Sequence, residues 1–338
     1  TFMRTIGHDN AINYLKNAYR QNSFAHFYIF YGPEHVGKTT LAYDFVKLLN
    51  CTSKENEFGC ESCENCKKIN LNNYYDLICV NSKTPIEGTS TNSSDQIRIG
   101  HIHQINHSAN LGPFIGKYKI FLIENAHNLN NEASNAFLKL LEEPPKGSIF
   151  IFLVSDLSKL YPTILSRAQK IVLSELRNVQ IEDWIKQKYD YDHETIEKIV
   201  QFSQGLLGKA FLVSENISLL EEYKESYNRF YEFCNSAMSN RLNISQKLST
   251  RFRTDRNGIY QELNNWMNFC DLIIKKNFEK ELNFIFDFDL KKTYSIMEIN
   301  KIIIILLRSI NNLQNNANSR LVFDVMSLDI PEKQNSVR

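Results

Sequence analysis

A phosphate-binding loop between an apolar strand and a helix constrains the fold of this chain more than any other feature. Residues 32–40 read Gly-Pro-Glu-His-Val-Gly-Lys-Thr-Thr, which fits the pattern Gly-x-x-x-x-Gly-Lys-Thr. The apolar run 27–31 precedes the loop, and residues 39–49 follow it with apolar side chains at helical spacing. This order of strand, loop and helix predicts an α/β fold in which the loop, at the end of a strand, binds the phosphates of a nucleotide.

The residue types of the loop predict how it would hold a nucleotide. Gly32 and Gly37 let the backbone bend around phosphate oxygens, and Lys38 adds a full positive charge. The hydroxyl of Thr39 is expected to join the shell of Mg²⁺, and the adjacent Thr40 is a further candidate for the site. The intact loop therefore keeps the groups that ATP or ADP with Mg²⁺ would need.

A cluster of cysteines after the loop predicts a metal site. Four of them fall within sixteen residues, on a polar segment that has few apolar side chains to form a core: Cys51, Cys60, Cys63 and Cys66. Thiolates in this number and spacing are typical of a structural, tetrahedral Zn²⁺. The spacing alone leaves an iron–sulfur cluster open, whereas a redox Cys-x-x-Cys pair would use only two of the four.

Composition excludes some classes of function. The 338 residues carry 39 Lys and Arg against 38 Asp and Glu, a formal net charge of +1. This balance argues against a protein that wraps nucleic acid with a broad basic face. The sequence contains no apolar stretch of transmembrane length, and we expect a cytoplasmic protein without a membrane partner. The length predicts two or three domains.

Further apolar runs alternate with helical segments. Residues 76–80, 118–123 and 149–154 are expected to be strands of a parallel sheet that helices cover on both faces. Asn130 or Asn131 is expected to cap a helix that ends before Pro144.

Two later motifs complete a family resemblance. Residues 136–145 read Ala-Phe-Leu-Lys-Leu-Leu-Glu-Glu-Pro-Pro, and residues 164–167 read Ile-Leu-Ser-Arg. Together with the phosphate loop and the cysteine module directly after its helix, these motifs resemble the bacterial clamp-loader branch of the AAA+ ATPases over roughly residues 6–211. The remaining third of the chain resembles that family only in length and helical character.

The resemblance implies a domain plan and a set of partners. It implies an AAA+ nucleotide-binding domain at residues 1–174, a parallel sheet flanked by helices with a zinc module at 51–66. A small helical lid would follow at 175–215, and an all-α collar that assembles with other subunits at 216–338. The implied partners are clamp-loader motor subunits, a delta subunit, the sliding clamp and, through the assembled complex, primed DNA.

Three departures separate the chain from the ATP-hydrolysing motor subunits of this family. Motors place Asp-Glu after a strand, the first acid for Mg²⁺ and the second for the attacking water, whereas this chain has Glu124-Asn125. Gly208 replaces the arginine that senses the γ-phosphate, and the adjacent Lys209 is expected to point elsewhere. Ala168 replaces a typical Cys. These departures resemble the delta-prime subunits, and we expect slow or absent hydrolysis.

The resemblance gives Arg167 a role outside its own chain. In the family this arginine reaches the ATP site of a neighbouring motor subunit and stabilises charge on the γ-phosphate. The alternative is that Arg167 pairs with a surface acid. Ser155 stands at the position of the first sensor of the family, and Glu124 keeps a carboxylate for the metal of a bound nucleotide.

Two other functions stay open. A gamma/tau-like motor that has diverged in its acidic motif would hydrolyse ATP as a single chain, and Lys38→Ala would abolish that turnover. A stand-alone AAA+ protein that uses zinc to bind DNA would bind DNA tightly in isolation, although the near-neutral charge argues against it.

Overall fold

The computed structural model describes the chain in four stretches, residues 4–53, 58–86, 96–278 and 294–331. Parts of the predicted cysteine module (54–57) and of the predicted collar (279–293 and 332–338) lie outside the described residues.

The chain divides into two compact units. The first consists of Thr1–Tyr191 and Ser203–Phe211, and the second of Asp192–Phe202 and Leu212–Arg338. Segments of the predicted lid therefore belong to both units, and the predicted boundaries at residues 174 and 215 remain a prediction.

Within its described residues, the first unit is built on a parallel sheet of five strands in the order β2-β3-β4-β1-β5. The strands are β1 (Phe27–Tyr31), β2 (Leu77–Val80), β3 (Lys119–Ile123), β4 (Ser148–Val154) and β5 (Gln169–Val172). The predicted parallel sheet is confirmed, because every pairing among these strands is parallel. Apolar runs such as β4 are buried along their whole length, as expected for strands covered on both faces. The sequence did not predict β5, in which only Ile171 is fully buried.

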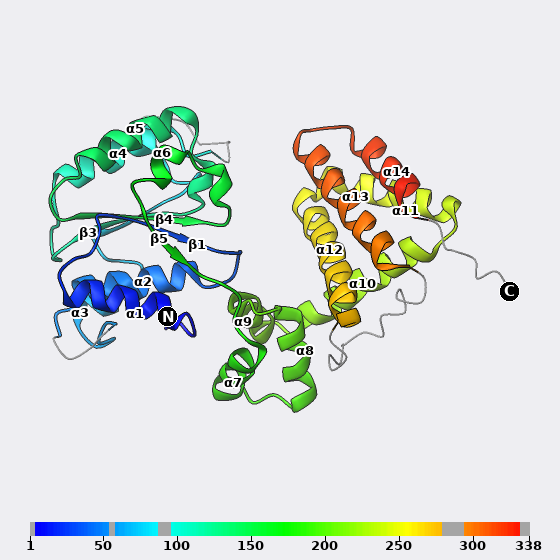
Figure 1. The fold of residues 1–338 in the computed structure, drawn as a ribbon, viewed down its shortest axis with the longest axis horizontal. Helices are drawn as coiled ribbons and strands as arrows, with labels where there is room; N and C mark the ends of the chain where they lie inside the picture. The colour runs from blue at the N-terminus through cyan, green and yellow to red at the C-terminus, as the bar shows by residue number, and fades with distance from the viewer. Residues whose placement is uncertain (1–3, 54–57, 87–95, 279–293, 332–338) are drawn as a thin grey trace. The chain divides into compact units, whose positions relative to one another are not determined.

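Helices cover both faces of the sheet (Figure 1). The helices drawn below it are α1 (Asp9–Arg20), α2 (Lys38–Asn50) and α3 (Glu64–Asn70), and those above it are α4 (Ile99–Asn110), α5 (Asn131–Glu142) and α6 (Pro162–Leu165). Tyr28 and Phe30 of β1 pack into the core with α2, while Phe27 and Ile29 face the opposite core with α5. This alternation follows from the period of two along a strand.

The caps of α5 agree with the sequence. The side chain of Asn130 accepts a hydrogen bond from the N–H of Ala133, and the helix ends at Glu142, before Pro144. The short helices η1 (Ala126–Asn128) and η2 (Leu157–Lys159) follow β3 and β4, and α7 (Asn178–Lys188) completes this unit together with the start of α9 (Leu207–Glu215).

The second unit is helical, as expected for this end of the chain. Most of α8 (His193–Ser203) precedes the long helices α10 (Ser218–Asn235), α11 (Met238–Thr254), α12 (Arg256–Phe278), α13 (Ile296–Gln314) and α14 (Ser319–Asp329). Phe230, Trp266 and Phe323 are fully buried in its core. The buried guanidinium of Arg241 donates to the carbonyl oxygens of Cys234 and Ile330, which ties the end of α14 to α10.

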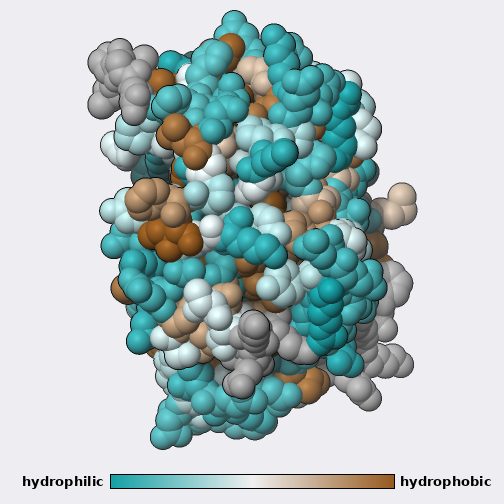
Figure 2. Space-filling model, turned by 90° about the vertical axis from the view of Figure 1, so that its left-hand side faces the viewer, coloured by the Kyte–Doolittle hydropathy of each residue, from teal (hydrophilic) through white to brown (hydrophobic). Residues whose placement is uncertain are grey.

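The described helices include none that is long and apolar enough to cross a membrane. The face drawn in Figure 2 carries mostly hydrophilic side chains, with hydrophobic ones gathered in small patches.

Candidate nucleotide site and four-cysteine cluster

The predicted nucleotide-binding residues meet at one edge of the sheet. Because the strands are parallel, their carboxyl ends lie on the same side. Gly32 follows β1, Glu124 follows β3 and Ser155 follows β4, and the N–H of Gly32 donates to the carbonyl of Val154 at 3.2 Å. The topology therefore brings three predicted site residues from distant parts of the chain to this edge.

Glycine is required at both ends of the phosphate loop. A Cβ on Gly32 would lie 2.1 Å from the carbonyl oxygen of Leu173, and Gly37 has a φ of 109° at the N-cap of α2. His35 also adopts the left-handed conformation, with a φ of 62°, which is uncommon for a residue with a Cβ. This conformation of His35 was not predicted from the sequence.

Lys38, Thr39 and Thr40 form the first turn of α2, so the free N–H groups of a helix N-terminus lie at the loop. The Lys38 ammonium donates to the carbonyl oxygens of Gly32 and Pro33 at 2.7 and 2.6 Å. Burial lowers the pKa of Lys38, and the charge of Glu34 opposes that shift. An ammonium whose partners among the described residues are neutral carbonyls, beside a helix N-terminus, suits a phosphate group.

Helix α9 docks on the phosphate loop. The N–H of Gly208 donates to the carbonyl of His35 at 2.8 Å, and a Cβ on Gly208 would lie 2.8 Å from that same oxygen. Glycine is therefore needed here for the close approach of two backbones.

Lys209 lies close enough to the phosphate loop for its charge to act on two loop residues, Glu34 and His35, while the expectation that its side chain points elsewhere stays a prediction. Burial lowers the pKa of Lys209, while the charge of Glu34 raises it, and the charge of Lys209 adds to burial in lowering the pKa of His35. Lys209 comes close to the loop because it lies in the first turn of α9, next to the contact that Gly208 makes with His35.

After β3 the chain carries one acid, Glu124, followed by the amide of Asn125. An oxygen of the Glu124 carboxylate accepts a hydrogen bond from the Asn81 amide at 3.0 Å. Asn125 adopts a left-handed conformation with a φ of 49°, and its side chain is exposed. After β3, Glu124 therefore offers a carboxylate, and the next residue offers a neutral amide.

Arg167 lies just after α6 and is paired with an acid. Its Nη2 donates to Oε1 of Glu142 at 2.8 Å, and its Nη1 donates to the carbonyl of Thr163 at 3.0 Å. The Arg167 and Glu142 side chains are 38% and 55% exposed. The guanidinium is thus both engaged within the chain and accessible from outside it.

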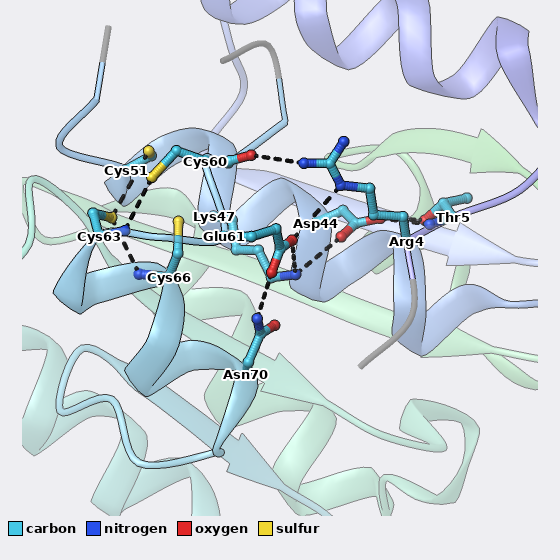
Figure 3. A network of polar contacts seen from close by, with 11 residues as sticks. Arg4, Thr5, Asp44, Lys47, Cys51, Cys60, Glu61, Cys63, Cys66 and Asn70 are labelled. Atoms are coloured by element: carbon cyan, nitrogen blue, oxygen red, sulfur yellow. Dashed lines mark hydrogen bonds and ion pairs between the residues drawn. The ribbon is translucent and has the colours of Figure 1, made fainter. Parts of the chain in front are cut away.

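The four predicted metal ligands lie together (Figure 3). Their sulfur atoms are all within 4.8 Å of one another, and those of Cys51 and Cys63 are 4.0 Å apart. Four thiolates around Zn²⁺ with Zn–S bonds of about 2.3 Å would be about 3.8 Å apart, so the cluster could hold such an ion.

Two of these sulfurs accept hydrogen bonds from backbone N–H groups. The N–H of Cys63 donates to Cys60 Sγ at 3.2 Å, and the N–H of Cys66 donates to Cys63 Sγ at 3.4 Å. Hydrogen bonds from Ser62 and Cys63 lower the pKa of Cys60 to about 6, whereas burial raises the pKa of Cys66. Cys60 therefore supplies a thiolate, the form that binds metal, near neutral pH.

A match to a family model decides where the chain belongs. Residues 7–177, half of the 338, match the family described as DNA polymerase III, delta subunit. The chain belongs to the DNA polymerase III delta-subunit family. The matched residues include the phosphate loop, the cysteine cluster and Arg167.

The curated proteins that this chain resembles are named as gamma and tau subunits of DNA polymerase III. The chain is 30% identical over 251 residues to DNA polymerase III subunit tau/gamma of Haemophilus influenzae, which covers 72% of the chain and 33% of the relative. It is 28% identical to DNA polymerase III subunit gamma/tau of Mycoplasma genitalium, over 88% of the chain and 46% of the relative. The chain thus spans about a third to a half of the length of these relatives.

The chain also has distant matches among solved structures. A gamma-subunit-related protein of Thermotoga maritima is 15% identical with a TM-score of 0.39, over 94% of this chain and 97% of that protein. The RuvB Holliday junction branch migration motor of the same organism is 15% identical with a TM-score of 0.40, over 66% of this chain and 63% of RuvB.

Proposed function

We propose that this chain is the delta-prime subunit of a bacterial clamp loader. In this role it assembles with motor subunits and a delta subunit, and the complex places a sliding clamp on primed DNA. The chain itself hydrolyses no ATP. It acts on ATP bound by its neighbour, to which it supplies Arg167.

The pair Glu124-Asn125 carries the first part of this proposal. Hydrolysis of a nucleoside triphosphate needs a group that orients the attacking water, and a carboxylate can also accept its proton. The exposed amide of Asn125 can hydrogen-bond to a water but accepts no proton. A nucleotide held by Lys38 and Thr39 would therefore be bound without being turned over.

The exposure of Arg167 supports its action in trans. The guanidinium is permanently charged and planar, which suits the oxygens of a γ-phosphate. Its bond to Glu142 is a half-exposed surface pair, and such pairs are worth about 0–1 kcal/mol. A phosphate of a neighbouring subunit can therefore take Arg167 from Glu142 at little cost in free energy.

Zn²⁺ is the metal we propose for the cysteine cluster. Four thiolates fill a tetrahedral shell and leave no position for a substrate, which is the arrangement of a structural site. The ion would hold together a segment that contributes only a few buried apolar residues, among them Cys66 and Ile69. This role also explains why the cluster is separate from the phosphate loop, at the opposite end of α2.

A motor subunit is the second candidate, because the matched relatives are named gamma and tau and the phosphate loop is complete. Steady-state ATP hydrolysis by the isolated chain separates the two. We expect no turnover above that of Lys38→Ala, together with nucleotide binding that Lys38→Ala abolishes. Turnover that depends on Lys38 would establish the motor. The variant Asn125→Glu then tests whether the missing carboxylate is what prevents hydrolysis.

A further inference from the structure

A buried lysine links α2 to the cysteine module. The Lys47 side chain is 0% exposed, and its ammonium lies 2.7 Å from Oε1 of Glu61 and 3.4 Å from Oδ1 of Asp44 (Figure 3). Asp44 also accepts hydrogen bonds from the backbone N–H and the hydroxyl of Thr5. Because a buried ammonium is costly without a partner, Lys47 strongly favours a conformation that keeps these carboxylates in place.

Glu61 stands within the Cys60-x-x-Cys63 turn, and its backbone is held in an unfavourable conformation. Its φ is 58°, in the left-handed region that side chains with a Cβ rarely adopt. Its carboxylate is fixed by Lys47 on one oxygen and by the side-chain amide of Asn70 on the other. A strained backbone of this kind persists only where the surroundings hold it, and here the two side-chain bonds do so.

The ion pair between Lys47 and Glu61 is linked to the segments that carry all four cysteines. The N–H of Cys51 donates to the carbonyl of Lys47 at 2.8 Å, and Glu61 lies between Cys60 and Cys63 in the chain. Asn70, the second partner of Glu61, ends helix α3, on which Cys66 lies.

The lysine stem also borders the cluster directly. A Cβ on Gly59 would lie 2.7 Å from Cβ of Lys47 and 3.3 Å from Sγ of Cys66, so both lie against the same point of the backbone. Four thiolates around one divalent cation leave a net negative charge, which a nearby buried ammonium stabilises. Arg4, whose Nε lies 3.8 Å from Glu61 and whose Nη2 donates to the carbonyl of Gly59, adds a second cation.

We propose that Glu61, held by Lys47, is a positioning residue for the metal site: it sets the spacing of the four sulfurs and thereby the affinity for the ion. This inference rests on the metal site proposed above. Since coupling is reciprocal, the bound ion should in turn strengthen the attachment of the module to α2. Lys47 and Glu61 would thus bind no metal themselves and act through the cysteines.

Zinc affinity of the full-length chain under reducing conditions tests the proposal. We would titrate Zn²⁺ against a chromophoric chelator for wild type, Glu61→Ala, Lys47→Met and the double variant. Loss of such a supporting partner typically weakens metal binding by about 10–100-fold, and we expect this range for Glu61→Ala. The double variant should lose less than the product of the two single losses, because the two residues act as a pair.

Glu64→Ala is the matched control. Glu64 lies in the same module and forms an ion pair of 2.6 Å with Lys68, but its side chain is 79% exposed. We expect its zinc affinity to stay within about twofold of wild type, as for an exposed surface pair. The visible spectrum of bound Co²⁺ provides a second readout, since a shift in Glu61→Ala but not in Glu64→Ala reports changed ligand geometry.

The outcomes are distinct. Wild-type affinity in Glu61→Ala, or an equal loss in Glu64→Ala, would overturn the positioning role while leaving the metal site intact. Failure of the wild-type chain to bind Zn²⁺ would overturn the metal site and the positioning role together, without touching the role of Arg167. If Lys47→Met does not fold, Glu61→Ala decides alone, because Glu61 is 32% exposed and its removal leaves Lys47 paired with Asp44.

Discussion

The guanidinium of Arg167 and the carboxylate of Glu142 face each other with Nη2 and Oε1 2.8 Å apart, at the residue where α5 ends. The two residues are 25 positions apart in the sequence and belong to separate motifs, Leu-Leu-Glu-Glu-Pro-Pro and Ile-Leu-Ser-Arg. In the proposed role, this pair would hold the guanidinium of Arg167 in place until a partner binds. Because both side chains are partly exposed, Arg167 would then exchange the carboxylate of Glu142 for a phosphate of the partner.

Glu142→Gln tests how firmly this pair holds. We expect the free energy of unfolding in urea to fall by less than about 1 kcal/mol, because the pair is half exposed to water. Glu143→Gln, one residue further on, serves as the control. A loss of several kcal/mol in Glu142→Gln but not in the control would show that the pair strongly stabilises the fold. Arg167 could then not leave Glu142 for a phosphate at little cost, which would contradict its proposed role.

Gly208→Ala tests the docking of α9 on the phosphate loop. In an ordinary helix position this change stabilises a protein by about 1 kcal/mol. Here the added Cβ would lie 2.8 Å from the carbonyl oxygen of His35, so we expect a loss of about 1–3 kcal/mol in denaturant unfolding. A gain in stability would show that the contact between Gly208 and His35 is not formed in solution.

Metal removal should destabilise the first unit. A ligand present at one hundred times its Kd stabilises the folded state by about 2.7 kcal/mol, so zinc at such excess should raise the unfolding midpoint and a chelator should abolish the gain. Cys66→Ser should behave like the chelated wild type, whereas Cys79→Ala, outside the cluster, should keep its response to zinc. If neither zinc nor the chelator changes the unfolding midpoint, the cluster does not hold a structural metal.

Acid should destabilise the first unit through its histidines. Burial lowers the pKa of His8, His35 and His127 below the ordinary value of 6.5. Below pH 6.5 the unfolded chain therefore binds more protons than the folded one, and stability present above that pH is lost as pH falls through the lowered values.

Thermal unfolding between pH 7.5 and about pH 5.5 measures this loss. The variant His35→Asn should lose less than wild type over the same range, since Asn does not titrate and tolerates the φ of 62° at this position. Identical slopes for the two proteins would exclude a contribution from His35.

The sheet could be predicted where a strand is buried on both faces. β1, β3 and β4 are near-continuous apolar runs, and the phosphate loop marks the end of β1. β5 was missed because its sequence, Gln-Lys-Ile-Val, buries only Ile171 at the edge of the sheet. A short edge strand carries too little apolar pattern to be read from one sequence.

The candidate site was predictable to the extent that its residues fall in contiguous motifs. The spacing of the four cysteines indicated their cluster, and the loop motif indicated Lys38. The pair of Lys47 and Glu61 was not predicted, because it joins a helix to a turn fourteen residues away and depends on tertiary packing. The approach of Lys209 to the loop depends in the same way on where α9 docks.

ATP hydrolysis by a reconstituted clamp loader, stimulated by clamp and primed DNA, tests the role of Arg167 most directly. Wild type would be compared with Arg167→Ala and with Arg177→Ala, which removes another exposed arginine of the same unit. An arginine finger is worth about 10³–10⁵ in turnover, so we expect Arg167→Ala to silence the neighbouring ATP site while the complex assembles and Arg177→Ala stays active. Unchanged turnover in an assembled Arg167→Ala complex would contradict a role for this chain in its neighbour's chemistry.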